Sequence, residues 1–84
     1  MNIDKLWENI IKHQGKEFFT KTGKEFSYSM LSDNTISINH TPCFISKNYF
    51  ETALKQMPIE KPFDIKGLRG YPYIFGILTD KRIM

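Results

Sequence analysis

Residues 17–39 read EFFTKTGKEFSYSMLSDNTISIN, and this stretch decides the fold that we expect for the chain. It holds three short runs rich in aromatic, β-branched and hydroxyl residues, at 17–21, 25–31 and 35–39, separated by turn residues. In the second and third runs, large apolar side chains stand at every other position: Phe26, Tyr28, Met30, Ile36 and Ile38. Alternate side chains of a strand point to opposite faces of its sheet. The pattern therefore predicts a three-stranded antiparallel meander with one apolar face.

Helices are predicted before and after the meander. An apolar stripe with helical spacing runs through residues 3–13, and a second stripe follows Ser46, an expected N-cap. The segment 71–83 has a strand-like composition, and Gly76 would cost a helix about 1 kcal/mol. Thirteen residues are nevertheless long for one strand, and Pro72 suits the first turn of a helix, so we predict a helix. The expected fold class is α+β, a three-stranded antiparallel meander packed against three helices in the order α-β-β-β-α-α.

Length and composition favour one intracellular domain. The 84 residues are enough for a single domain, 1–84, and 40% of them are hydrophobic, which suffices for a core. The lone cysteine, Cys43, excludes a disulfide framework and is typical of a reducing cytoplasm. Asp4 and Glu8 interrupt the N-terminal apolar residues, as they would not in a secretion signal. No apolar run approaches the roughly 20 residues of a membrane span, so we expect a cytoplasmic protein without a membrane segment.

Several cations have no explanation in the predicted core. The net charge of +3 weakly favours an acidic partner. Lys21 and Lys24 flank the turn of the first predicted hairpin, where they would contact phosphates or simply protect a solvated edge. The planar fork of Arg69, close to two glycines, could hold a phosphate at two points. The candidate phosphate contacts are Lys21, Lys24, Lys47, Arg69, Lys81 and Arg82.

Lys47 is the most informative of these cations. It follows the expected cap Ser46, where a positive charge opposes the helix dipole. A phosphate on the free N–H groups of the helix start would offset that cost. A fully exposed lysine, at a cost of a few tenths of a kcal/mol, explains the position equally well.

No metal, cofactor or catalytic constellation is predicted. His40 and Cys43 have ligand types that zinc accepts, but the chain has only one further histidine and no second cysteine, and zinc requires four ligands. Cys43 could act as a nucleophile with His40 as its base, although a lone cysteine is more often a small buried apolar residue. Asp33 and Asp80 are the other acid–base candidates, and nothing in the spacing brings them together. We therefore expect no enzyme.

Three segments, 19–28, 45–54 and 69–83, resemble a small bacterial domain family of unassigned function, found alone or beside DNA-processing modules. The shared pattern is a basic turn, an Ile-Ser-Lys helix start and a closing Arg-Gly…Tyr-Ile…Asp-x-Arg-Ile segment. The family has Gly-Pro-small-Tyr where this chain has Gly70-Tyr71-Pro72-Tyr73, and commonly alanine in place of Gly76. The resemblance implies a DNA-linked role.

Two functions are predicted. The first is a small, non-enzymatic nucleic-acid-binding accessory module that contacts the phosphate backbone through the six cations. The alternative is a protein-interaction module, an adaptor or inhibitor of a larger enzyme. It is motivated by the seven Phe, four Tyr and one Trp, which are many for a small core, and by the role of Tyr and Trp as interface anchors. Tyr49 and Tyr71 are the aromatic residues expected to be exposed.

Overall fold

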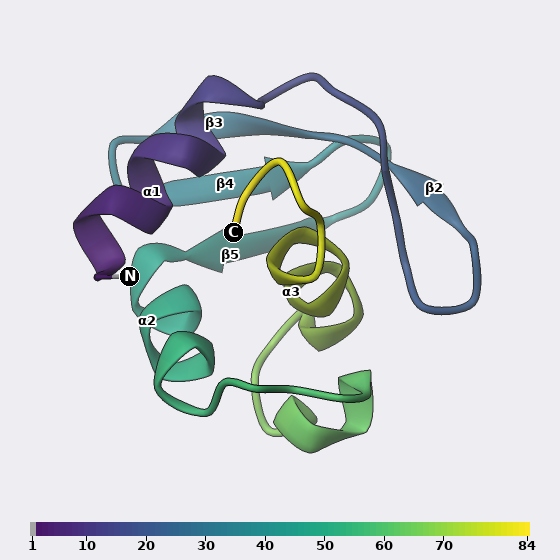
Figure 1. The fold of residues 1–84 in the computed structure, drawn as a ribbon. Helices are drawn as coiled ribbons and strands as arrows, with labels where there is room; N and C mark the ends of the chain where they lie inside the picture. The colour runs from purple at the N-terminus through teal and green to yellow at the C-terminus, as the bar shows by residue number, and fades with distance from the viewer. Residues whose placement is uncertain (1) are drawn as a thin grey trace.

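A computed structural model describes residues 2–84 of the chain. The elements are α1 (Ile3–Lys12), β1 (Phe18–Phe19), β2 (Glu25–Phe26), β3 (Tyr28–Ser32), β4 (Thr35–Ile38), β5 (Cys43–Ser46), α2 (Lys47–Lys55), the 3-10 helix η1 (Pro62–Ile65) and α3 (Tyr71–Leu78). Strands β3, β4 and β5 form an antiparallel meander, and the α-helices lie on one side of it (Figure 1). The predicted α+β class and the helix–sheet–helix order are confirmed. Within residues 2–84, no helix is long and apolar enough to cross a membrane.

The membership of the meander differs from the prediction. The first run does not join the three-stranded sheet, because β1 pairs only with β2 in a separate two-stranded sheet. The third strand is instead β5, with Ile45 opposite Ile36 of β4. The four residues of β5 alternate like any half-buried strand, with Ile45 buried and Phe44 exposed. Pro42 stands directly before it, where proline is tolerated next to the first residue of an edge strand.

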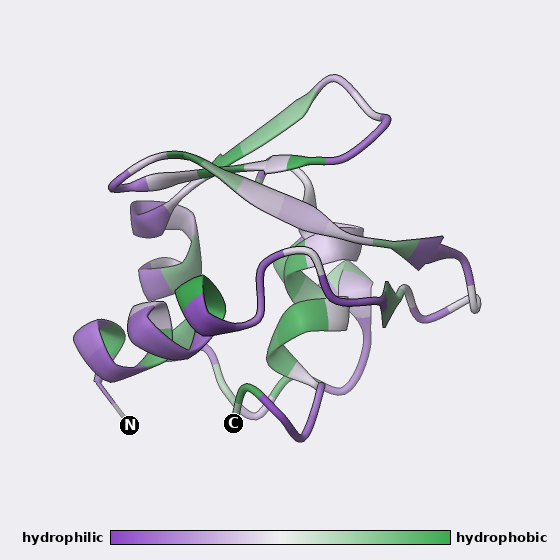
Figure 2. Cartoon of the chain, turned by 90° about the horizontal axis from the view of Figure 1, so that it is seen from above, coloured by the Kyte–Doolittle hydropathy of each residue, from purple (hydrophilic) through white to green (hydrophobic). Residues whose placement is uncertain are grey.

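The core lies between the inner face of the meander and the three α-helices. The sheet contributes Tyr28, Ile36, Ile38 and Ile45, all buried. Helix α3 is the most buried helix, since every residue from Ile74 to Leu78 is buried, and it is coloured as hydrophobic over most of its length in Figure 2. This helix was predicted for 71–83, but it ends at Leu78, where the Thr79 hydroxyl donates to the carbonyl of Phe75 at 2.7 Å.

Two long-range hydrogen bonds attach α1 to the meander. The hydroxyl of Tyr28, buried on β3, donates to the carbonyl of Ile10 at 2.6 Å. The indole Nε1 of Trp7 donates to the carbonyl of Asp33, in the β3–β4 turn, at 2.8 Å. Both side chains are amphipathic and buried, so each polar end needs such a partner. Burial raises the pKa of Tyr28 far above its usual value, which keeps this hydroxyl a donor.

Two glycines allow α3 to approach the strands closely. A Cβ on Gly76 would lie 2.5 Å from the carbonyl oxygen of Phe19, so α3 rests almost directly on the backbone of β1. Gly70, just before α3, has φ +74°, and a Cβ there would lie 2.7 Å from Cδ1 of Ile45. These positions need glycine for space in the first case, and for space and backbone conformation in the second.

The first prediction concerns these glycines. Gly76→Ala and Gly70→Ala should each lower the free energy of unfolding by about 1–3 kcal/mol, because backbone or packed side chains must move. The matched control is Gly67→Ala, since a Cβ at Gly67 meets no atom within 4 Å and should change stability little. Urea denaturation followed by circular dichroism measures all three. Equal stability of Gly76→Ala and the natural protein would contradict the close packing of α3 on β1.

Candidate functional site

The six predicted phosphate contacts do not form one surface. Lys21 and Lys24 are exposed at the tip of the β1–β2 hairpin, which projects from one side of the molecule. Lys47 is the first residue of α2, at the opposite side (Figure 1). Arg69 precedes Gly70 in the connection to α3, and Lys81 and Arg82 follow α3. A single stretch of nucleic-acid backbone on one face would therefore contact only part of the set.

Lys47 has a partner within the fold. Its Nζ lies 3.1 Å from Oδ1 of Asp4, which is in the first turn of α1. Its backbone N–H donates to the carbonyl of Asn34 at 2.7 Å, and the side chain of Ser46 does not cap the helix. The ion pair joins the first turns of α1 and α2. The negative charge of Asp4 is favourable at both helix N-termini, so it offsets the unfavourable position of Lys47 at the start of α2.

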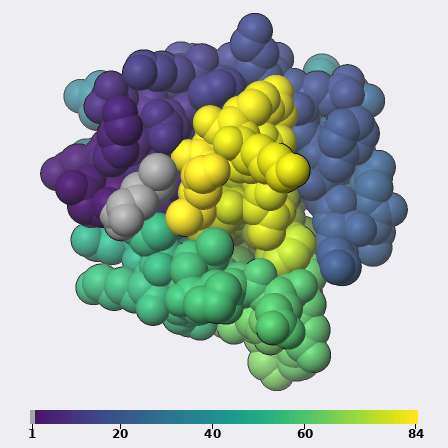
Figure 3. Space-filling view, in the orientation of Figure 1, coloured from purple at the N-terminus to yellow at the C-terminus, as the bar shows by residue number. Residues whose placement is uncertain are grey.

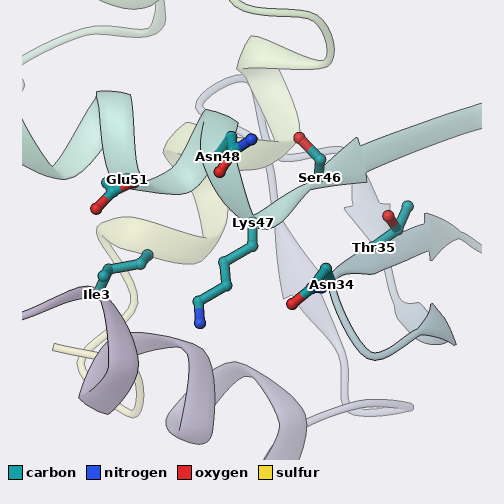
Figure 4. A pocket seen from close by; sticks show the side chains of 7 residues that line it. All are labelled: Ile3, Asn34, Thr35, Ser46, Lys47, Asn48 and Glu51. Atoms are coloured by element: carbon teal, nitrogen blue, oxygen red, sulfur yellow. The ribbon is translucent and has the colours of Figure 1, made fainter.

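A polar pocket of about 400 Å³ opens beside this ion pair (Figure 4). Figure 4 shows the Lys47 side chain extending away from Ser46, so its ammonium group does not reinforce the helix N-terminus. Glu51 also lines the pocket, and its carboxylate would repel a phosphate placed there. The residues that line it are Ile3, Asn34, Thr35, Ser46, Lys47, Asn48 and Glu51.

Arg82 fastens the C-terminal segment to the body of the domain. Its Nε and Nη2 each lie 2.9 Å from an oxygen of Asp80, and Nη2 also donates to the carbonyl of Glu17 at 2.6 Å. The guanidinium carbon lies 4.4 Å from the ring centre of Phe18. The hydrogen bonds from Arg82 hold the pKa of Asp80 below its usual value. All the Arg82 contacts therefore have a structural explanation that requires no ligand.

The last residues extend this attachment. Ile83 is buried, and Nδ2 of Asn9 on α1 donates to its carbonyl at 2.9 Å. Figure 3 shows the C-terminal residues filling the space between α1 and the β1–β2 hairpin. The segment Asp80–Ile83 contains two predicted phosphate contacts, Lys81 and Arg82. Its last residue, Ile83, is nevertheless part of the core.

The predicted catalytic candidates are not assembled into a site. Cys43 is half-buried behind Gly70, and burial raises the pKa of its thiol, with nearby Arg69 acting in the opposite direction. The hydrogen bonds of residues 2–84 include none between His40 and Cys43, and the backbone N–H of Cys43 donates to the carbonyl of Thr41. Asp33 lies in the β3–β4 turn, and Asp80 follows α3. The same residues contain no group of three side chains able to hold a metal ion.

The exposed apolar side chains include only one of the two aromatic residues that were predicted to be exposed. Tyr49 is exposed, but Tyr71 is only half-exposed and packs against the core. Leu31 and Ile11 are the informative pair: they are 58% and 39% exposed and share the wall of a pocket of about 440 Å³. We call this pocket the β3-edge groove; its lining residues are Ile11, Met30, Leu31, Ser32 and Asp33.

A β-bulge lies at the β3-edge groove. The pairing of β3 with β4 shifts register between Met30 and Ser32, which leaves Leu31 without a direct partner. Alternation with Met30 already directs Leu31 away from the core, and a bulge changes the local direction of the side chain further. Period-two alternation predicted Met30 inward correctly, but the sequence carries no clear signal for the bulge.

Comparison with protein-family models, curated proteins and solved structures finds no match for this chain. The resemblance to a small bacterial domain family therefore stays a prediction. The candidate site rests on the geometry of the residues themselves.

The second prediction tests the role of Arg82. Arg82→Ala should lower the free energy of unfolding by about 1 kcal/mol, since an exposed ion pair is screened and the contact with Phe18 adds a modest amount. Because the pKa of Asp80 is lowered by folding, this contribution is present above about pH 4, the usual range of an aspartate, and is lost as pH falls further. Denaturant titrations at pH 7 and pH 3 measure both effects.

The matched control for Arg82→Ala is Lys81→Ala, its neighbour, which makes no ion pair within residues 2–84. Lys81→Ala should leave stability unchanged. If both variants were equally stable at pH 7, the attachment by Arg82 would be wrong.

Proposed function

We propose that this chain is a protein-interaction module, an adaptor or inhibitor of a larger enzyme, that binds its partner through the β3-edge groove. The observation that supports the proposal is the exposure of Leu31 beside Ile11 at a groove between a helix and an edge strand. Exposed apolar side chains that lie together, rather than singly, are typical of interaction sites.

Two backbone groups on the edge of β3 already have partners. The N–H of Gly15 donates to the carbonyl of Tyr28 at 2.8 Å, and the N–H of Met30 donates to Oε1 of Gln14 at 3.2 Å. Edge strands associate non-specifically when such groups are unpaired. These two groups are therefore not available to pair with the strand of a partner.

The aromatic residues that first suggested this function contribute less than expected. Trp7, Phe18, Phe26, Tyr28 and Phe50 are all buried in the core. The apolar side chains available to a partner are instead Leu31 and Ile11 at the groove. Phe44, which is 52% exposed on the outer face of β5, is a further candidate contact.

Nucleic-acid binding is the second candidate, and the hairpin tip favours it. Lys21 and Lys24 are exposed on a projecting turn and form no ion pair within residues 2–84. Lys47 and Arg82 have internal partners, so four candidate phosphate contacts remain. Of these, Lys21 and Lys24 lie together at the tip, whereas Arg69 and Lys81 flank α3. The carboxylates of Glu17 and Glu25 at the base of the hairpin oppose an anion there, which is why this function ranks second.

The third prediction tests the β3-edge groove. A photo-reactive amino acid at position 31 should crosslink to one defined partner in cells, whereas the same group at Phe63, equally exposed at 59% on η1, should not. With that partner purified, Leu31→Ser should weaken binding by at least about tenfold, because a buried leucine contributes about 1.5–3 kcal/mol. Phe63→Ser is the matched control and should bind like the natural protein. Equal affinity of both variants would reject the groove.

The fourth prediction tests the second candidate with duplex DNA. If the tip contacts phosphates, log K should fall with log salt at a slope near −0.9 per contact, and Lys21→Glu with Lys24→Glu should abolish binding. Lys55→Glu with Lys61→Glu, the same charge change elsewhere, should not. Fluorescence anisotropy at two salt concentrations measures the binding of duplex DNA. Absence of binding at low salt would reject nucleic-acid binding as a function.

A further inference from the structure

The two edge strands of the meander, β3 and β5, differ in how their backbone groups are paired. In an antiparallel pair, residues that exchange hydrogen bonds with the neighbouring strand alternate with residues whose N–H and C=O point away from it. On β3, two of these outward groups are occupied. The carbonyl of Tyr28 accepts from Gly15, and the N–H of Met30 donates to a side chain. The segment that follows α1 therefore covers part of this edge.

The outward groups of β5 belong to Phe44 and Ser46. The alternation is fixed at the end of the strand, where the N–H of Lys47 donates to the carbonyl of Asn34, the next pair in the register of β5 with β4. Two residues back along the strand, Ile45 therefore faces β4, and its neighbours face away from it. Within residues 2–84, no turn, loop or cap pairs with the backbone of Phe44.

The strand β5 has few of the features that keep edge strands apart. It reads Cys-Phe-Ile-Ser, without a charged residue, and it pairs with β4 without a register shift. Edge strands are protected by charges, prolines, bulges, a covering segment or short length. β5 has only its length of four residues and the preceding Pro42. These limit the number of hydrogen bonds at the edge, but they leave the donor and acceptor of Phe44 unpaired.

A cation stands beside this edge. Gly70 lies against the side chains of Cys43 and Ile45, which places the neighbouring Arg69 near the start of β5. The positive charge of Arg69 acts to lower the pKa of the Cys43 thiol, against the effect of burial. Arg69 is exposed and makes no ion pair within residues 2–84. The β5 edge therefore combines unpaired backbone groups with a positive charge that the described fold does not neutralise.

We propose that the β5 edge binds an extended, acidic segment of the protein partner by strand addition. The N–H and C=O of Phe44 would pair with the backbone of the added strand, as they would with a further strand of the sheet. Side chains of the added strand alternate between the two faces. Those on the face of Cys43 lie beside Arg69, where a carboxylate is favoured. Those on the other face contact the exposed ring of Phe44.

The contacts at the two edges differ in kind. The β3-edge groove offers apolar side chains, whereas the β5 edge offers backbone groups and a charge. The inference rests on the proposed function, because its occupant is a segment of the protein partner. A second copy of this chain is a poorer occupant, since β5 holds no carboxylate that could meet Arg69 of the other copy.

The experiment selects its probe from a randomised library. Peptides of about six residues, the usual length of a strand, are displayed on phage and selected against the isolated protein. The best peptide is then titrated into the ¹⁵N-labelled protein, and amide shifts are followed by NMR. We expect an acidic residue at one position of the peptide, and saturable shifts centred on β5 rather than on the β3-edge groove.

Methylation of the selected peptide tests the backbone contact. In an added strand, alternate N–H groups face β5 and the others face solvent. Methylation of one alternate set should abolish binding, and methylation of the other set should leave it unchanged. A peptide held by its side chains alone would not show this alternation.

Charge exchange tests the role of Arg69. Arg69→Glu should weaken binding of the selected peptide by about tenfold, because an opposite charge becomes a like charge. Lysine in place of the acidic residue of the peptide should restore binding to this variant. Lys55→Glu, the matched control at the end of α2, should leave binding unchanged. The NMR spectrum of each variant reports directly whether it is folded.

Failure to select any peptide, a selected peptide without an acidic residue, equal effects of the two methylations, or unchanged binding by Arg69→Glu would each overturn the inference. Concentration-dependent shifts of β5 amides without peptide would also overturn it, because a second copy would then occupy the edge.

The proposed function is tested separately. A selected peptide whose binding is lost with Leu31→Ser would lie in the β3-edge groove, which would overturn the inference and support the proposed function. Conversely, peptide binding at β5, together with no effect of Leu31→Ser on the whole partner, would keep the inference and reject the groove.

Discussion

The structure depends on the burial of one face of a three-stranded sheet. Helices α1, α2 and α3 all pack on the inner face of this sheet (Figure 2). Tyr28 illustrates the constraint, because its ring lies in the core while its hydroxyl fixes α1 to the sheet. A consequence is that groups able to meet a partner are confined to the outer face, the strand edges and the hairpin.

Two of the six candidate cations, Lys47 and Arg82, are used for internal attachment. Asp4 and Lys47 are 43 residues apart and hold two helix starts together, and Arg82 reaches back to the carbonyl of Glu17, 65 residues earlier. A cation that looks unexplained in the sequence can therefore be satisfied by a residue far along the chain. What distinguishes Lys21 and Lys24 is their position on a projecting turn.

Local patterns in the sequence predicted most of the fold. The apolar stripe of α1, the alternation in β3 and β4, and Pro72 at the start of α3 all have direct counterparts in the structure. The strand β5 was not predicted, because four residues after a proline are too few for a clear period. The β1 segment was assigned to the wrong sheet. The hairpin pattern predicts that β1 pairs with the next strand, but it does not show that this strand ends at Phe26 and that the chain enters a second sheet at Tyr28.

The candidate sites were less predictable for the same reason. The sequence carries no clear signal for the register shift between Met30 and Ser32 that leaves Leu31 without a direct partner on β4. The β3-edge groove joins Ile11 of α1 to Leu31 of β3, two segments that only the tertiary structure brings together.

The central claim, that the domain is held together by one-sided burial under α3, is tested most directly by native-state hydrogen exchange. The account predicts that amides of Ile77 and Leu78 in α3 exchange only through global unfolding, with the same free energy as those of Ile36 and Ile38 in β4. Exchange of the α3 amides through a low-energy local opening, while β4 remains protected, would contradict it.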